Sequence, residues 1–398
     1  MHGRRPNQPV YLDNQSTTPC DPRVVEAMLP WFTERFGNPH SAEHALGREA
    51  GEAVEAARAE VAALIGGEAR EVVLASGATE ANNLAIKGAA RFAASQGGGR
   101  RRVVTAATEH PCVLEAVRDL ALEGFEPVVL AVEPDGRLDP ARLREALAVP
   151  TLLVSVMAAN NETGVLQDLA ALAAAARESG ALFHTDAAQA AGKVPLDAHS
   201  LGLDLLSLSG HKLYGPKGVG ALWVRRRPRV RLSPLFSGGG QERGLRPGTL
   251  PSPLVVGLGE ACRIARAEMA EEAARVGAER DRLLAALRGA VPSLAVNGTL
   301  AHRLPGNLNL AFPGVTAQAL MAAVPELCVS TGSACSSAEI ETSHVLRAMG
   351  VPEAAARGSL RLGLGRFTSA ADVDFAAGAL AAAYRAETSH AQDVLRRA

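Results

Sequence analysis

The sequence predicts an α/β protein, with a mostly parallel central sheet in a large domain and a smaller α+β domain beside it. Three observations lead to this fold class. Short apolar runs alternate with helical patterns from about residue 70 to residue 225, as in a parallel sheet covered on both faces. A long helical pattern follows at 258–289. Beyond it, short apolar runs and helices are mixed.

The length and composition agree with two domains. A chain of 398 residues can bury a substantial core, and its 47% of hydrophobic residues predict a globular protein. We expect residues 21–257 to form the large domain, and residues 1–20 and 258–398 to form the small one. The net charge of −1 provides no global field that favours nucleic acid, so direct nucleic-acid binding is not expected.

The cysteines and the N-terminus predict a cytoplasmic protein. The five cysteines are odd in number and widely spaced, without a C-x-x-C pair, so neither a metal site nor a disulfide framework is expected. A reducing cytoplasm fits this pattern. The first residues lack the apolar core of a signal peptide. Pro305 and Pro313 interrupt the longest uncharged stretch, 304–325, so we expect no membrane span.

Each predicted strand is a short aliphatic run bounded by glycine, proline or polar residues. Before the first run, Val54, Val61 and Leu64 recur at helical spacing, and Gly66 with Gly67 predicts the end of that helix. The predicted strands lie at 71–76, 103–105, 127–130, 151–157, 181–186 and 204–208 in the large domain, and at 308–312, 327–329 and 360–362 in the small one.

The segment Ser209–Lys212 follows one of these strands and suggests a cofactor site. Open α/β sheets bind ligands beyond the carboxyl ends of their strands. A lysine there can form a Schiff base with an aldehyde, and Ser209 and His211 can hold a phosphate beside it. An aldehyde with a phosphate describes pyridoxal phosphate. Taken alone, the four residues fit an exposed loop lysine equally well.

Asp186 ends the preceding predicted strand, about one β–α unit before Lys212. A carboxylate at this edge can pair with the protonated nitrogen of a pyridine ring and keep the ring an electron sink. Gln189, three residues later, can donate to the phenolic oxygen of the ring. The alternative interpretation of Asp186 is an ordinary helix N-cap.

Two further strand ends point to the same edge. After the strand at 71–76, small residues lead into a helix near Thr79, whose backbone N–H groups and hydroxyl can bind an anion. An ordinary capped helix would look the same. His110 lies just beyond the strand at 103–105, on the expected ligand side.

Cys335 lies among small residues, in a loop that we expect to be mobile at about 328–343. A thiol with room to move can act as a nucleophile once it is deprotonated. The alternative is an incidental surface cysteine.

Together these stretches resemble the cysteine desulfurases of the class V, fold-type I pyridoxal-phosphate enzymes, in particular the iron–sulfur-cluster and nitrogen-fixation type with a long cysteine loop. The resemblance extends from Tyr11 to about Phe367. The order and spacing of the segments make it specific. They are residues 13–19, 36–39, 76–83, 108–110, 160–162, 186–189, 209–212, 246–249, 332–335 and 361–366.

The resemblance implies a fold-type I transferase and a role for each residue around the cofactor. Lys212 would bind pyridoxal 5'-phosphate covalently and later move protons at the substrate carbons. His110 would stack on the ring and assist acid–base steps. Asp186 would pair with the ring nitrogen, while Gln189 and Asn161 would contact the ring-oxygen region.

The resemblance also implies how the phosphate is held and that the protein is a homodimer. Thr249 would reach the phosphate of the neighbouring subunit. Within one subunit the phosphate would be held by Ala78, Thr79, Ser209 and His211.

The implied substrate is L-cysteine. Arg361, with Asn38 and Asn161, would bind its carboxylate, for which a bidentate guanidinium is suited. Cys335 would attack the substrate sulfur and carry it as a persulfide, leaving L-alanine. The sulfur would pass to an acceptor such as an iron–sulfur scaffold protein, or toward tRNA thiolation or cofactor sulfuration.

Two departures and three alternatives stand beside this interpretation. The alanine-rich tail after Phe367 ends at Ala398, whereas some relatives continue and dock a scaffold through their tail. Ala188 stands where some relatives have threonine. A selenocysteine lyase or another aminotransferase-type enzyme would keep Lys212 and Asp186, but an aminotransferase would not need Cys335. A non-enzymatic homologue is disfavoured because all three residues are present.

Overall fold

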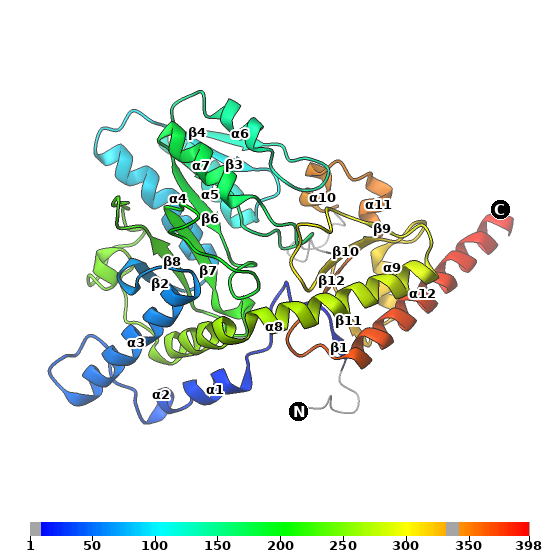
Figure 1. Cartoon of the computed structure of the whole chain (residues 1–398), viewed down its shortest axis with the longest axis horizontal. Helices are drawn as coiled ribbons and strands as arrows, with labels where there is room; N and C mark the ends of the chain where they lie inside the picture. Colours follow the sequence, from blue (N-terminus) through cyan, green and yellow to red (C-terminus); the bar gives the residue numbers. More distant parts are fainter. Residues whose placement is uncertain (1–8, 332–341, 398) are drawn as a thin grey trace.

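The computed structural model describes residues 9–331 and 342–397. A large α/β part and a smaller part are joined by one long helix, α8, which runs from beneath the large sheet into the smaller part (Figure 1). The α-helices are α1 (Pro22–Met28), α2 (Pro30–Thr33), α3 (Ala45–Leu64), α4 (Ala78–Ser95), α5 (Pro111–Asp119), α6 (Pro140–Ala146), α7 (Leu169–Ser179), α8 (Ser252–Ala290), α9 (Ala317–Ala323), α10 (His344–Ala348), α11 (Glu353–Arg357) and α12 (Ala370–Arg397).

The strands form a large sheet, a small sheet and an isolated pair. They are β1 (Val10–Tyr11), β2 (Val72–Ala75), β3 (Arg102–Ala106), β4 (Glu126–Leu130), β5 (Thr151–Ser155), β6 (Leu182–Asp186), β7 (Leu205–Ser209), β8 (Gly220–Val224), β9 (Ala295–Val296), β10 (Asn307–Ala311), β11 (Leu327–Cys328) and β12 (Ser359–Gly363). Four 3-10 turns are η1 (Ala69–Glu71), η2 (Leu120–Glu123), η3 (Gly210–Lys212) and η4 (Glu242–Gly244).

The large sheet confirms the predicted fold class. Its strand order is β2-β8-β7-β6-β5-β3-β4, and all neighbouring pairs are parallel except those that involve β8. The sequence prediction missed β8, a short apolar run that joins the sheet between β2 and β7. Because β8 is antiparallel, Gly220 lies opposite Ser209, directly beside the predicted cofactor site.

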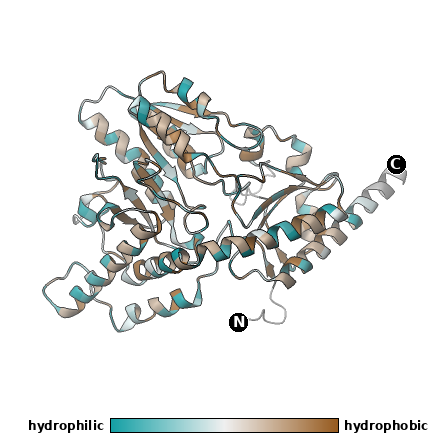
Figure 2. Cartoon of the chain, viewed as in Figure 1, coloured by the Kyte–Doolittle hydropathy of each residue, from teal (hydrophilic) through white to brown (hydrophobic). Residues whose placement is uncertain are grey.

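Most residues of this sheet are buried because helices cover it, whereas the edge strand β4 is partly exposed. Every residue of β2, β7 and β8 is buried, as continuous apolar runs in a covered sheet require. The strands are coloured mainly hydrophobic, whereas α1 and α3 show hydrophilic stretches (Figure 2). Because β3, β5, β6 and β7 are parallel, their carboxyl ends meet at one edge of the sheet.

The small part has its own core around the antiparallel sheet β12-β10-β9. An extended segment at residues 9–21, the N-terminal arm, contributes β1, which pairs in parallel with β11. The first half of α8 packs in the large core, with Val255 and Ile264, whereas Val276 and Leu287 of its second half pack in the small one. The predicted boundary after residue 257 falls inside this helix, and the division into domains stays a prediction.

Candidate active site

Lys212 lies in η3, immediately after the buried strand β7. Its Nζ donates hydrogen bonds to the carbonyl oxygens of Gln15 at 2.6 Å and Ser16 at 2.7 Å. The N-terminal arm therefore covers the lysine. Gln189 contacts the same arm, since its Nε2 donates to the Gln15 carbonyl at 2.8 Å. Its Oε1 accepts a hydrogen bond from Lys193 Nζ. Burial, followed by the charge of Lys212, lowers the pKa of Lys193 to about 7.

Asp186 is the last residue of β6 and is buried. Its Oδ2 accepts a hydrogen bond from Asn82 Nδ2 at 2.8 Å, and its Oδ1 accepts from the backbone N–H of Ala188 at 2.8 Å. These two donors hold the carboxylate in one orientation. The sequence analysis missed Asn82. The feature of the sequence that could have indicated Asn82 is a side-chain amide inside the apolar pattern of α4. The structure buries this amide fully, and a buried polar group needs a hydrogen-bond partner.

His110 is the N-cap residue of α5, and Pro111 occupies the first helical position. Its Nδ1 accepts a hydrogen bond from the backbone N–H of Cys112 at 3.2 Å and lies 3.0 Å from Cys112 Sγ. Burial lowers the pKa of His110. The charge of Asp186 raises this pKa, whereas the charges of Lys212 and His344 lower it further. The neutral ring therefore carries its proton on Nε2.

The thiol of Cys112, beside His110, is the second group after Asn82 that the sequence did not reveal. Burial, followed by the charge of Asp186, raises the pKa of this thiol to about 12. The group is therefore neutral and serves as packing and a weak hydrogen-bond partner beside His110.

The predicted phosphate residues lie around the N-terminus of α4. A Cβ atom placed on Gly77 would lie 3.7 Å from Ser209 Oγ, so the hydroxyl stands close to the turn that precedes Ala78. The first N–H groups of this helix lack helical acceptors and suit an anion. Thr79 is exposed at the same end.

His211 contacts the N-terminal arm. Its Nδ1 is 3.0 Å from Thr17 Oγ1. Burial, followed by the charges of Lys212 and Lys217, lowers the pKa of His211 to about 4. At neutral pH this ring is therefore uncharged and can offer a phosphate a hydrogen bond rather than a positive charge.

Thr249 is exposed in a single subunit. The segment that carries it is held beside α4, since Arg246 Nε donates to Glu80 Oε1 at 2.8 Å. Its contact with the phosphate of a neighbouring subunit stays a prediction.

Arg361 lies on β12 of the small sheet and faces the N-terminal arm. Its Nη2 donates to Asp13 at 2.8 Å and to Ser16 Oγ at 2.5 Å, and its Nη1 donates to the carbonyl oxygen of Asn161 at 3.0 Å. The structure therefore brings Arg361 and Asn161 together. Asn38 is exposed, with its Oδ1 accepting from the backbone N–H of His40, so its contact with substrate stays a prediction.

Cys335 lies outside the described residues, but both flanks of its segment border this site. On one side Arg361 N–H donates to the carbonyl oxygen of Ser330 at 2.7 Å. On the other side Ser343 Oγ donates to Glu162 Oε2 at 2.5 Å, and His344 Nε2 lies 3.0 Å from the carbonyl oxygen of Glu109.

The arrangement fits pyridoxal phosphate. A lysine amine, a carboxylate with fixed orientation and a helix N-terminus beside a hydroxyl are grouped at one sheet edge. Two buried polar atoms there also lack partners among the described residues, namely Asn82 Oδ1 and Arg361 Nε. Since buried polar atoms are normally satisfied, these suit a polar ligand.

Residues 9–331 and 342–397 contain no group of three or more side chains that could hold a metal ion together. None of the helices in this part of the chain combines the length and apolar character needed to cross a membrane.

The sequence matches the aminotransferase class-V family over residues 10–375. The chain belongs to this family. It is 56% identical over 366 residues to the cysteine desulfurase IscS of Anaeromyxobacter sp. (strain Fw109-5), which covers 92% of this chain and 90% of that protein. It is 51% identical over 368 residues to the cysteine desulfurase IscS of Rickettsia bellii (strain OSU 85-389), with 92% and 89% covered.

Solved structures agree with these relatives. A NifS-like protein superposes with a TM-score of 0.87 at 34% identity and covers 94% of this chain and 98% of that one. DndA from Streptomyces lividans has a TM-score of 0.75 at 44% identity, with 88% and 98% covered. The predictions of a pyridoxal-phosphate-dependent enzyme, of its fold and of membership among the cysteine desulfurases are confirmed.

Proposed function

We propose that the chain removes sulfur from L-cysteine, forms L-alanine and carries the sulfur as a persulfide on Cys335 to an acceptor protein. One observation carries this proposal: Lys212, Asp186 and His110 converge at one sheet edge, Arg361 approaches them from the other core, and both flanks of the Cys335 segment border the same site.

Each residue has a distinct part in this chemistry. Bound pyridoxal phosphate supplies an electron sink for the substrate's α-carbon. Arg361 binds the substrate carboxylate, and Asn161 orients the guanidinium through its carbonyl oxygen. Lys212 moves the proton between the substrate carbons, while Asp186 holds the negative charge that stabilises a protonated ring nitrogen.

The sulfur-transfer step needs no oxidant or reductant besides the substrate and the Cys335 thiolate. The Cys335 thiolate attacks the substrate sulfur, a sulfur–sulfur bond forms, and the carbon–sulfur bond breaks. The electron pair stays on the carbon fragment, which takes up protons to become L-alanine. His110 starts with its proton on Nε2, so it acts first as a donor and accepts the thiol proton only after passing its own proton on.

The test is to change Cys335→Ala and supply L-cysteine with labelled sulfur. We expect unchanged cofactor absorbance, and persulfide formation and sulfur transfer reduced at least 100-fold, because the attacking atom is gone. Cys328→Ala is the matched control, since this unpaired cysteine lies at β11 close to the same loop. Full sulfur transfer by the Cys335→Ala variant would refute the proposed role.

We also propose a cytoplasmic homodimer that passes sulfur to an iron–sulfur scaffold protein. Four apolar side chains support the dimer, because they are 40–66% exposed on neighbouring turns: Val25, Leu29, Phe32 and Phe36. Cys20, Cys112, Cys262 and Cys328 are all unpaired, which suits a reducing compartment. Incubating the persulfide form with purified candidate acceptors and following the label identifies the recipient.

A further inference from the structure

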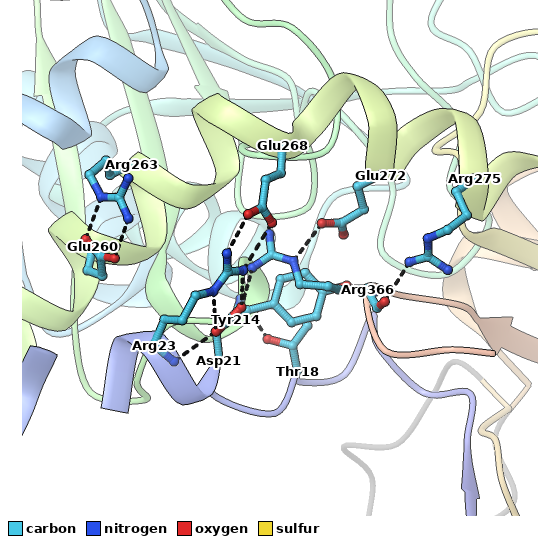
Figure 3. Close-up of polar contacts among 10 residues, drawn as sticks. All are labelled: Thr18, Asp21, Arg23, Tyr214, Glu260, Arg263, Glu268, Glu272, Arg275 and Arg366. Carbon is cyan, nitrogen blue, oxygen red and sulfur yellow. Dashed lines mark hydrogen bonds and ion pairs between the residues drawn. The ribbon is translucent and has the colours of Figure 1, made fainter. Parts of the chain in front are cut away.

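Lys212 belongs to the large core and Arg361 to the small one, yet both must meet the same substrate. A polar junction at the middle of α8 connects the chain segments that follow Lys212 and Arg361 (Figure 3). We define this junction as Asp21, Tyr214, Glu272 and Arg366.

Tyr214 is the large-core member of the junction, two residues after Lys212. Its backbone has a left-handed conformation, with φ at 63°, which is uncommon for a residue with a side chain. Two hydrogen bonds hold it there: its N–H donates to Thr18 Oγ1 at 2.9 Å, and its carbonyl oxygen accepts from the N–H of Asp21 at 2.9 Å. The turn that carries the lysine is therefore fixed to the N-terminal arm.

Arg366 is the small-core member, five residues after Arg361. Its backbone N–H donates to the Tyr214 hydroxyl at 2.5 Å, and its guanidinium carbon lies 4.3 Å from the centre of the Tyr214 ring. The guanidinium also donates to Glu272 at 2.7 Å and to Asp21 at 2.8 Å. Its side chain is only 8% exposed, so these contacts are largely shielded from solvent.

The Arg366 guanidinium pairs with both carboxylates of the junction, Glu272 and Asp21. Burial opposes ionisation of Asp21, but hydrogen bonds from Arg23 and Arg366 outweigh it and lower the pKa of this carboxyl to about 2. Burial, followed by the charge of Glu272, raises the pKa of Tyr214. The phenol is therefore neutral while the ion pairs persist around it. A cavity of about 30 Å³ lies beside Tyr214 and Glu272.

We propose that Tyr214 and Arg366 are positioning residues that set the spacing between Lys212 and Arg361, and thereby the affinity for the amino-acid substrate. The proposal rests on the proposed function. A substrate held at its carboxylate by Arg361 must place its α-carbon at Lys212, so an error in spacing weakens productive binding. The Tyr214 hydroxyl accepts from the backbone N–H of Arg366, and the Tyr214 ring lies against the Arg366 guanidinium, so these contacts join the segments that follow Lys212 and Arg361.

The experiment uses full-length holoenzyme with Tyr214→Phe, Arg366→Gln or Arg366→Lys. We expect Arg366→Gln to raise KM for L-cysteine about tenfold, with a smaller change in kcat. The dissociation constant for L-alanine, measured by calorimetry, should rise by a similar factor. Tyr214→Phe keeps the ring and should show a smaller effect in the same direction. Arg366→Lys retains the charge and should recover part of the loss.

The matched control is Arg263→Gln, which removes an exposed ion pair with Glu260 on the same helix and leaves the junction intact (Figure 3). It should leave both constants unchanged. If Arg366→Gln and Tyr214→Phe lose only resistance to urea and bind L-alanine like the unchanged protein, the positioning role is wrong. If the unchanged protein binds L-alanine but releases no sulfur from L-cysteine, the proposed function fails instead, and the binding data still test the junction.

Discussion

At the scale of single residues, burial decides the protonation state of several histidines. His184 is fully buried between two serines, with Nδ1 2.8 Å from Ser155 Oγ and Nε2 3.0 Å from Ser207 Oγ. Burial lowers its pKa to about 3. The sequence shows this residue two positions before Asp186 but does not reveal that it is uncharged, because that depends on neighbouring strands.

His184 should make the protein sensitive to acid. The pKa is about 6.5 in the unfolded chain, so below that value the unfolded state binds the proton that the folded state excludes. Stability should therefore fall as the pH falls, by about 2 kcal/mol between pH 7 and pH 5, and the loss should level off near pH 3. Urea unfolding across this range measures the slope.

The variant His184→Gln separates this residue from other titrating groups. It can still hydrogen-bond to the serines but cannot take up a proton, so the slope between pH 7 and pH 5 should become shallower. His302→Gln, at an exposed histidine, should keep the original slope. Identical slopes in all three proteins would show that His184 does not control acid sensitivity.

Among the elements, an internal ion pair holds the glycine-rich segment 238–248, which contains η4, against the large core. Arg58 on α3 donates to both carboxylate oxygens of Glu242 in η4, at 2.7 and 2.8 Å. The same carboxylate accepts from the N–H of Leu74 on β2 at 2.7 Å. Glu242 and Arg243 have positive φ angles of 48° and 59°, so the segment that leads to Thr249 depends on these contacts.

Arg58→Met should lower the free energy of unfolding by about 3–5 kcal/mol, because it leaves the buried Glu242 carboxylate without its cation. The double variant with Glu242→Met should be less destabilised than Arg58→Met alone. Urea unfolding measures both. Arg91→Met, which breaks a more exposed pair with Glu123, should change stability by at most about 1 kcal/mol. A loss below about 1 kcal/mol in Arg58→Met would contradict this account of the element.

At the scale of the whole molecule, the proposed homodimer makes each site depend on two chains. Thr249 is exposed in one subunit, whereas Lys212 lies in a covered site. If Thr249 binds the phosphate in the partner's site, each site takes Lys212 from one subunit and Thr249 from the other. Lys212→Ala and Thr249→Ala then remove groups that different subunits contribute to a site.

Mixing these two inactive or weakened variants should therefore restore activity. A heterodimer of Lys212→Ala and Thr249→Ala has one site with both residues intact and one with neither. After unfolding and refolding of an equimolar mixture, we expect desulfurase activity of about one quarter of the unchanged protein, since half the dimers are mixed and each has one intact site. Failure to exceed the average of the two separate variants would show that Thr249 acts within its own chain or not at all.

The α/β class, most of the strands and the residues that follow them could be predicted from the amino-acid sequence, because hydrophobic period and chain order are local properties. The sequence predicted Lys212, Asp186 and His110 at strand ends, and parallel strands bring such ends to one edge. It missed β8, Asn82 and the junction of Tyr214 with Arg366. These features emerged from the folded chain, because their partners lie far away in the sequence and a hydrogen bond across 152 residues leaves no local pattern.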